Sequence, residues 1–175
     1  MILNGHSYYS LRYGTLSIKE LIDIAKANQY NSIALTDINN TSGVLHFVKA
    51  CYDQSIKPIV GAEFRSGDEL LFVAIAINNE GFREVNELLT LTNLTGVPYP
   101  TRPTFNHCYI IYPYGTTHAA LKENEYIGVR LGDLNKIIVE KKSIQKKYVI
   151  LQSSTFKNKA GYIIHKKIGR ASCRE

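Results

Sequence analysis

Three apolar runs that each end in a polar cluster most constrain how this chain can fold. Ile2 and Leu3 lead into His6, residues 33–35 lead into Asp37, and residues 59–60 lead into Glu63. A helical stretch separates each run from the next. Strands that carry polar side chains at their carboxyl ends, and alternate with helices, are how a parallel α/β barrel builds a site. The sequence therefore predicts a barrel in which His6, Asp37 and Glu63 converge.

The rest of the chain continues this alternation. Ser17 followed by Glu20 predicts a capping box at the start of a helix, in which Leu21 and Ala25 repeat at helical spacing. Three prolines within residues 96–103 predict a loop. Other patterns predict strands over residues 32–36, 57–64, 70–77, 108–112, 126–130 and 148–152, and helices over 43–53, 80–92 and 133–140. The expected fold class is α/β, as one incomplete barrel.

Composition narrows the setting. A length of 175 residues suits one domain, and no apolar run approaches the ~18 residues of a membrane span. The N-terminus lacks the pattern of a signal peptide. Cys51, Cys108 and Cys173 show no CxxC spacing, which favours a reducing compartment over a disulfide framework. We expect a cytoplasmic protein without a membrane partner.

The positive charge lies in one region. Residues 141–167 hold eight lysines and no acid, whereas the first 140 residues hold 11 basic and 14 acidic groups. Such a stripe could follow a phosphate backbone, but a solvated lysine-rich face and loop is the interpretation that we favour. Tyr8, Tyr9 and Tyr13 cluster beside the predicted site, where they could fill space or stack on nucleic acid. No phosphate-loop, dinucleotide or nucleophile-elbow motif is present.

The last eight residues form a separate segment. Residues 168–175 look like the translation of a sequencing adapter, so we expect a non-native tail after Lys167. On that expectation the chain is a fragment that ends within a longer reading frame. A barrel cut near Gln152 would leave an unpaired strand edge, which predicts an aggregation-prone fragment.

Four segments carry a family resemblance: residues 6–14, 34–37, 56–64 and 79–82. At these residues the chain resembles the N-terminal PHP (polymerase and histidinol phosphatase) domain of the bacterial DNA polymerase III alpha subunit. The segments occur in the family's order and spacing. The resemblance implies a truncated PHP domain over residues 1–167, with the incomplete, distorted TIM-like (β/α) barrel of that type.

The resemblance also implies where metal ligands would lie. A working PHP site opens with a His-x-His pair, and Asn4 and His6 match it here. Tyr13 matches a family carboxylate. Ile38 and, in an ungapped alignment, Leu71 match family histidines. Metal-binding side chains remain only at His6 and Glu63, so the degenerate set of positions is Asn4, His6, Tyr13, Ile38, Glu63 and Leu71.

This donor set predicts a site without metal. A divalent cation needs three or four N, O or S donors, and isoleucine and leucine supply none. Without metal, no hydroxide nucleophile forms near neutral pH. His6 could still act as a general base oriented by Asp37 or Glu63. The interpretation that we favour is that these three side chains hydrogen-bond one another as a remnant scaffold.

Three functions follow from the resemblance. The first is a metal-free structural PHP domain, with the rest of the alpha subunit, DNA through the parent and replisome subunits as partners. In that case the parent is a DNA-directed DNA polymerase whose Mg²⁺ lies outside this chain. The second is an active PHP phosphoesterase that uses Zn²⁺ or Mn²⁺, for example a 3′–5′ exonuclease. The third, a stand-alone phosphatase of the histidinol-phosphate type, is disfavoured by the polymerase-like segment 57–64.

Overall fold

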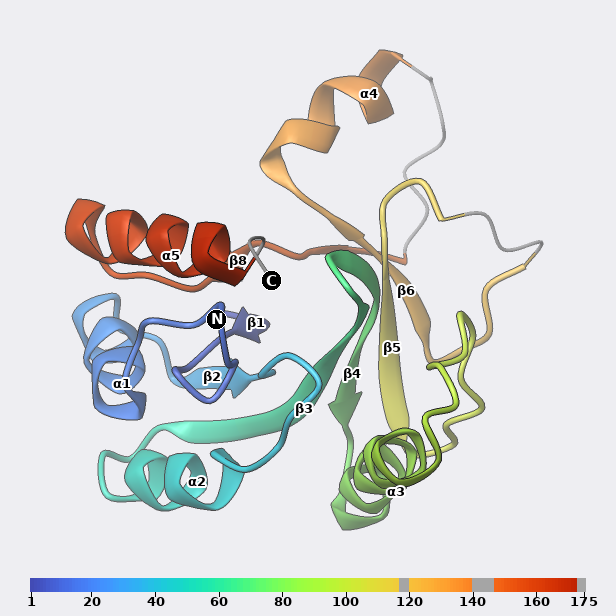
Figure 1. The fold of residues 1–175 in the computed structure, drawn as a ribbon, viewed down its shortest axis with the longest axis horizontal. Helices are drawn as coiled ribbons and strands as arrows, with labels where there is room; N and C mark the ends of the chain where they lie inside the picture. Colours follow the sequence, from blue (N-terminus) through green and yellow to red (C-terminus); the bar gives the residue numbers. More distant parts are fainter. Residues whose placement is uncertain (117–119, 140–146, 173–175) are drawn as a thin grey trace.

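The computed structural model describes residues 1–116, 120–139 and 147–172 (Figure 1). Lys141, Lys142 and Lys146 of the lysine-rich region, together with Cys173 and His118, lie outside these residues. The strands are β1 (Asn4–Gly5), β2 (Ser32–Leu35), β3 (Lys57–Ser66), β4 (Glu69–Ala76), β5 (Cys108–Pro113), β6 (Glu125–Val129), β7 (Tyr148–Ile150) and β8 (Ser153–Ser154). The helices are α1 (Ile18–Ala27), α2 (Val44–Tyr52), α3 (Asn79–Thr95), the 3₁₀ turn η1 (Leu131–Asp133), α4 (Leu134–Val139) and α5 (Lys159–Ser172).

The main sheet has six strands in the order β2-β3-β4-β5-β6-β7, and it curls around the middle of the molecule (Figure 1). An incomplete TIM-like α/β fold is therefore confirmed. The expectation of parallel strands throughout is wrong, because β4 runs antiparallel to both β3 and β5. A tight turn at Gly67, where φ is 57°, joins β3 directly to β4 without the helix that a parallel crossover needs.

Residues 148–154 form two short strands that pair with different neighbours. β7 pairs with β6, and β8, three residues further on, pairs with β1 in the register Asn4↔Ser153 and Gly5↔Ser154. The N–H of His6 extends this pairing to the carbonyl of Ser154 at 2.9 Å. Among the described strands β7 pairs with β6 alone, so the expected edge near Gln152 is present at the end of the main sheet, whereas the residues just after it pair with the N-terminal strand.

The predicted helices are confirmed, with one omission. The capping box of α1 forms as expected: Ser17 Oγ accepts from the N–H of Glu20 at 3.1 Å, and Glu20 Oε2 accepts from the N–H of Ser17 at 2.9 Å. The omission is α5, which occupies residues that the sequence analysis treated as a lysine-rich face and loop. Its backbone continues past Lys167, and the origin of residues 168–175 stays a prediction.

The core divides between the two faces of the sheet. One cluster packs α1 and α2 on β2, and a second packs α3 on the outer face of β3, β4 and β5 around Phe64, Phe72 and Tyr112. A third, smaller cluster lies on the inner face around Val73, Ile111 and Leu151. These packed layers hold the ends of β1, β2 and β3 next to one another.

Candidate functional site

The predicted polar residues come together where β1, β2 and β3 lie side by side. His6 follows β1 and Asp37 follows β2, whereas Glu63 lies inside β3, which extends past its pairing with β2. At most 1% of the surface of Asn4, His6, Asp37 and Glu63 is exposed. The predicted meeting of His6 with Glu63 is confirmed, and it lies in the buried interior of the protein.

Glu63 is the centre of one group of contacts, which we call the Glu63 cluster: Asn4, His6, Glu63 and Arg65. Glu63 Oε2 accepts from Asn4 Nδ2 at 2.7 Å and lies 3.1 Å from His6 Nε2. Glu63 Oε1 accepts from Arg65 Nε. Both carboxylate oxygens are therefore occupied by protein groups.

The other atoms of the Glu63 cluster also have protein partners. His6 Nδ1 lies 3.2 Å from Thr155 Oγ1, just after β8. Asn4 Oδ1 accepts from Thr36 Oγ1 at 2.8 Å, and Asn4 Nδ2 also reaches Ser153 Oγ at 3.1 Å. The cluster is a connected network in which both ring nitrogens of His6 and both polar atoms of the Asn4 amide have protein partners.

Electrostatics keep Glu63 ionised. Burial by itself would raise its pKa, but the hydrogen bond and charge of His6, the charge of Arg65 and the amide of Asn4 lower the pKa to about 2. Arg65 responds in the opposite sense: burial opposes its charge, yet Glu63 and Tyr13 raise the pKa of Arg65. The pair is thus a buried ion pair at neutral pH.

Asp37 belongs to a different group. Its Oδ1 accepts from the N–H of Ser7 at 2.7 Å and from Ser10 Oγ at 2.6 Å, and its Oδ2 accepts from Ser7 Oγ at 2.7 Å. The expectation that three side chains bond one another is therefore right for His6 and Glu63 and wrong for Asp37. Asp37 instead fixes the loop 7–14, which folds so tightly that a Cβ at Gly14 would lie 1.7 Å from the carbonyl oxygen of Ser7.

The remaining predicted positions differ in where they lie. The Tyr13 ring packs edge-on against His6, with centroids 5.5 Å apart, and Arg65 lies over the same ring at 4.5 Å. The backbone of Ile38 bridges to Glu63. Leu71 packs against the second core cluster, so the structure does not bring it to the Glu63 cluster.

The residues present fit a metal poorly. In residues 1–116, 120–139 and 147–172, no three His, Cys, Asp or Glu side chains lie where they could hold an ion. His6 Nε2 and Glu63 Oε2 face each other, and Arg65 faces the other carboxylate oxygen. A cation there would have to displace a guanidinium, and His6 and Glu63 alone supply fewer than the three or four donors that a divalent cation needs.

Sequence reasoning missed Arg65 and Thr155. Arg65 follows Glu63 by two residues, but its position depends on the register shift between Phe64 and Arg65, which no local pattern in one sequence locates. Thr155 was not detectable either, because its contact with His6 spans 149 positions. Of the other histidines, His46 and His107 are exposed, and His165 Nδ1 lies 2.8 Å from the carbonyl oxygen of Tyr13, so α5 covers that residue.

A second buried carboxylate lies away from this site. Glu125 Oε1 accepts from Arg102 Nε at 2.9 Å and from the Tyr112 hydroxyl at 3.2 Å, and its Oε2 accepts from the N–H of Lys122 at 2.7 Å. Burial opposes its charge, but these donors lower the pKa of Glu125 to about 2. Glu125 thus joins Arg102, Tyr112 and Lys122, and these contacts include no residue of the Glu63 cluster.

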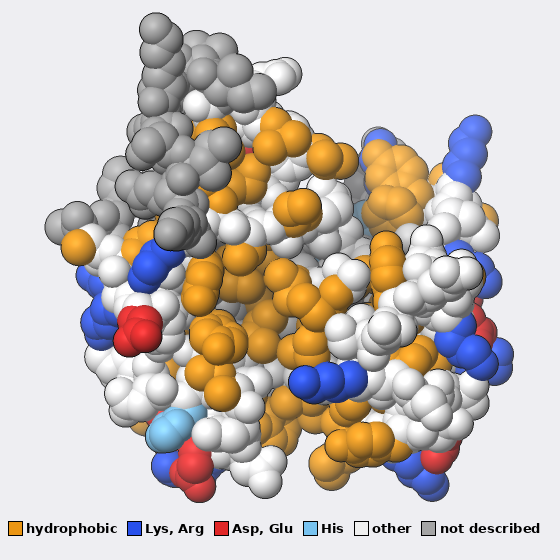
Figure 2. Space-filling view, turned by 180° about the vertical axis from the view of Figure 1, so that it is seen from behind, with side chains coloured by type: hydrophobic (Ala, Val, Ile, Leu, Met, Phe, Trp, Pro, Cys, Tyr) orange, Lys and Arg blue, Asp and Glu red, His pale blue; other side chains and the backbone are white. Residues whose placement is uncertain are grey.

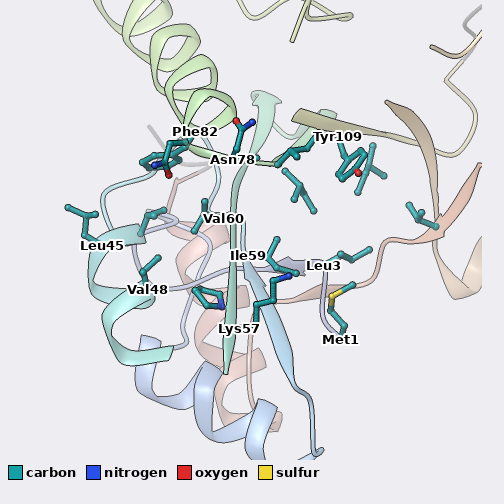
Figure 3. Close-up of a pocket in the computed structure, with 18 of the residues that line it drawn as sticks. Met1, Leu3, Leu45, Val48, Lys57, Ile59, Val60, Asn78, Phe82 and Tyr109 are labelled. Atoms are coloured by element: carbon teal, nitrogen blue, oxygen red, sulfur yellow. The ribbon is translucent and has the colours of Figure 1, made fainter. Parts of the chain in front are cut away.

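An apolar groove of about 720 Å³ opens elsewhere on the sheet. Apolar side chains gather on this face of the molecule (Figure 2), and the close-up shows Leu3, Ile59 and Val60 inside the groove with Leu45 and Lys57 at its margin (Figure 3). At about 3.3 Å per strand residue, Ile59 lies roughly 13 Å along β3 from Glu63. The groove and the Glu63 cluster are thus separate places.

Comparison with known proteins identifies the relatives of this chain. A family model described as "PHP domain" matches residues 3–164. The DNA polymerase III subunit alpha of Treponema pallidum is 32% identical over 114 residues, covering 57% of this chain and 10% of that protein. The same subunit of Halalkalibacterium halodurans is 37% identical over 96 residues, covering 51% of this chain and 8% of that protein. The matched part is thus about a tenth of the length of these relatives.

The similarity to solved structures is partial. An amidohydrolase structure from Chromobacterium violaceum, with bound sulfate and no metal, is 26% identical and has a TM-score of 0.43. The match covers 53% of this chain and 33% of that one.

Across the residues that the structure describes, none of the helices combines the length and the apolar character that crossing a membrane requires.

Proposed function

Because this chain belongs to the PHP domain family, we propose that it works as the PHP region of a DNA polymerase III alpha subunit and is metal-free there. In that role it is a structural module. Template-directed DNA synthesis, with its Mg²⁺, would be the activity of a full-length parent like the relatives, of which the match covers 8–10%. The remainder of the subunit, DNA through the parent and other replisome subunits would be its partners.

One observation carries the proposal: every oxygen of Glu63 already has a protein partner. Asn4 and His6 share Oε2, and Arg65 takes Oε1. A metal site needs lone pairs directed at an empty position, with three or more donors around it. This arrangement favours a folded remnant whose charges are satisfied internally.

The alternative function is a metal-dependent PHP phosphoesterase. The contact of 3.1 Å between His6 Nε2 and Glu63 Oε2 favours it, because a carboxylate that orients an imidazole is a common acid–base pair. However, His6 is fully buried, so a phosphoester could reach it only if the loop 7–14 or α5 moved. We therefore rank it second.

Metal analysis tests the choice. Protein purified from cultures supplied with zinc and manganese is expected to carry substoichiometric amounts of both by elemental mass spectrometry. His6→Ala should leave that content unchanged, as should His46→Ala, an exposed control. Stoichiometric metal that His6→Ala removes, accompanied by hydrolysis of a phosphodiester substrate, would establish the phosphoesterase instead.

A further inference from the structure

We propose that Arg65 supplies, from within the protein, the positive charge that a divalent cation would supply in a metal-holding site. This inference rests on the proposed function and names what keeps the site free of metal. The side chain of Glu63 is 0% exposed and that of Arg65 is 10% exposed, so the two charges meet with little access to water. Arg65 contacts Oε1, the carboxylate oxygen that Asn4 and His6 do not use.

A buried carboxylate of this kind needs a permanent partner. An ionised carboxylate left unpaired in a protein interior is strongly unfavourable. A guanidinium stays protonated at any pH at which proteins fold, whereas an imidazole is charged only when it binds a second proton. Of the described residues in ion pairs with Glu63, Arg65 is therefore the one whose charge does not depend on pH.

The backbone is shaped to direct Arg65 at the site. The register between β3 and β4 shifts between Phe64 and Arg65, and a bulge of this type redirects a side chain. Asn39, at φ 49°, holds the shifted segment. Its Oδ1 accepts from the N–H of Arg65 at 2.9 Å, and its Nδ2 donates to the carbonyl of Arg65 at 3.0 Å. The loop after β2 thus fixes the arginine.

Tyr13 completes the arrangement. The guanidinium carbon of Arg65 lies 4.5 Å from the centre of the Tyr13 ring, which is within the range of a cation–π contact. The backbone carbonyl of Tyr13 in turn contacts His165 on α5. Tyr13 stands where the resemblance places a carboxylate ligand, so the ring covers the internal cation at that position. Arg65 and Tyr13 together therefore occupy the space next to the Glu63 carboxylate.

The test measures the thermal stability of purified variants of this 175-residue chain, with and without added zinc or manganese chloride. The variants are Arg65→Gln, Arg65→Lys, the double variant Glu63→Gln with Arg65→Gln, and Arg102→Gln. Arg102→Gln is the control, since it removes the arginine paired with the other buried carboxylate, Glu125, although Arg102 itself is 33% exposed. Bound metal is measured in parallel by equilibrium dialysis.

We expect Arg65→Gln to lower Tm by roughly 10 °C, because it leaves a buried carboxylate uncompensated. Added metal should restore part of that loss, and the double variant should restore part of it without metal. Arg65→Lys keeps the positive charge, so added metal should raise its Tm no more than it raises the Tm of the wild-type chain. The same is expected of Arg102→Gln. If Arg65→Gln is unfolded, both responses are measured as regained circular dichroism.

The outcomes separate this inference from the proposed function. The role of Arg65 as the internal cation is overturned if metal does not raise the Tm of Arg65→Gln, or if the double variant is no more stable than Arg65→Gln. In that case a metal-free wild-type chain would still agree with the proposed function. Stoichiometric metal in the wild-type chain would contradict the proposed function itself. A gain of metal binding confined to Arg65→Gln supports both.

Discussion

At the scale of single residues, Glu63 is a buried carboxylate whose two oxygens both contact protein groups. Its carboxylate accepts from an amide, an imidazole and a guanidinium, so it stays ionised although it is buried. Such a group stabilises the fold only while it is charged. Its value to the protein should therefore depend on pH.

Acid should remove the contribution of Glu63 to stability. Its pKa falls from an ordinary 4.5 to about 2 in the folded chain. Glu63 therefore makes its full contribution to the free energy of unfolding at pH values above its pKa in the unfolded chain. This contribution is lost as the pH falls toward its pKa in the folded chain. At most, the contribution is roughly 3 kcal/mol. In urea unfolding at a series of pH values, the stability gap between wild type and Glu63→Gln should narrow from about pH 5 downward.

Two other variants frame that measurement. Glu125→Gln should show the same narrowing, because its donors also lower the pKa of Glu125 to about 2. Asp68→Asn, in the exposed turn between β3 and β4, should leave the free energy of unfolding nearly unchanged. A gap for Glu63→Gln that stays constant down to pH 3 would refute the ionised state of Glu63.

The sequence predicted part of this residue-scale arrangement. His6 and Glu63 were paired correctly because strand ends in a barrel meet at one edge. Asp37 was misassigned because its carboxylate accepts hydrogen bonds from Ser7 and Ser10, in the loop after β1, and such contacts between distant segments leave no local pattern. Arg65 depends on a bulge, and no local pattern in one sequence locates a register shift.

At the scale of elements, segment 148–154 is the decisive one. Its first half pairs with β6 and its second half with β1, so it joins the two ends of the strand order. Local patterns predicted a strand here, but they could not reveal its second partner, which lies at the other end of the chain. The antiparallel β4 and the helix α5 were missed for similar reasons, since pairing direction and tertiary packing decided both.

Leu151 tests whether this segment is integral to the fold. It lies between β7 and β8, is 1% exposed and packs with Val73, Ile75 and Ile111. Leu151→Ala should lower the free energy of unfolding by roughly 2–4 kcal/mol, because it leaves a cavity. Ile150→Ala, at a position that is 73% exposed, should change it by less. Equal effects in chemical denaturation would mean that the segment is only loosely attached.

At the scale of the whole molecule, the apolar groove exposes several large side chains to solvent. Leu45 is 79% exposed and Tyr52 is 69% exposed at its margin. Exposed apolar surface of this kind favours self-association. The aggregation expected from the sequence stays a prediction, and the groove is a second surface, besides the edge of β7, through which it would occur.

Leu45→Lys should reduce that tendency. A lysine keeps helix propensity but places a charge at the margin of the groove, so binding of an apolar fluorescent dye and concentration-dependent light scattering should both fall. Leu94→Lys is the matched control, since Leu94 is 82% exposed on α3 and does not line the groove. Equal effects of the two substitutions would show that general charge, and not the groove, controls association.

The pairing of β8 with β1 has a consequence for biosynthesis. Asn4 meets Ser153, and His6 meets Thr155, across 149 positions of sequence. During synthesis the first strand can meet the β2 segment early, because the N–H of Thr36 donates to the carbonyl of Gly5, but its β8 partner is made much later. Contacts of such long range also close slowly. The hydrogen bonds of Asn4 with Ser153 and of His6 with Thr155 therefore form only after residue 155 has left the ribosome, and this interval is when a chaperone would matter most.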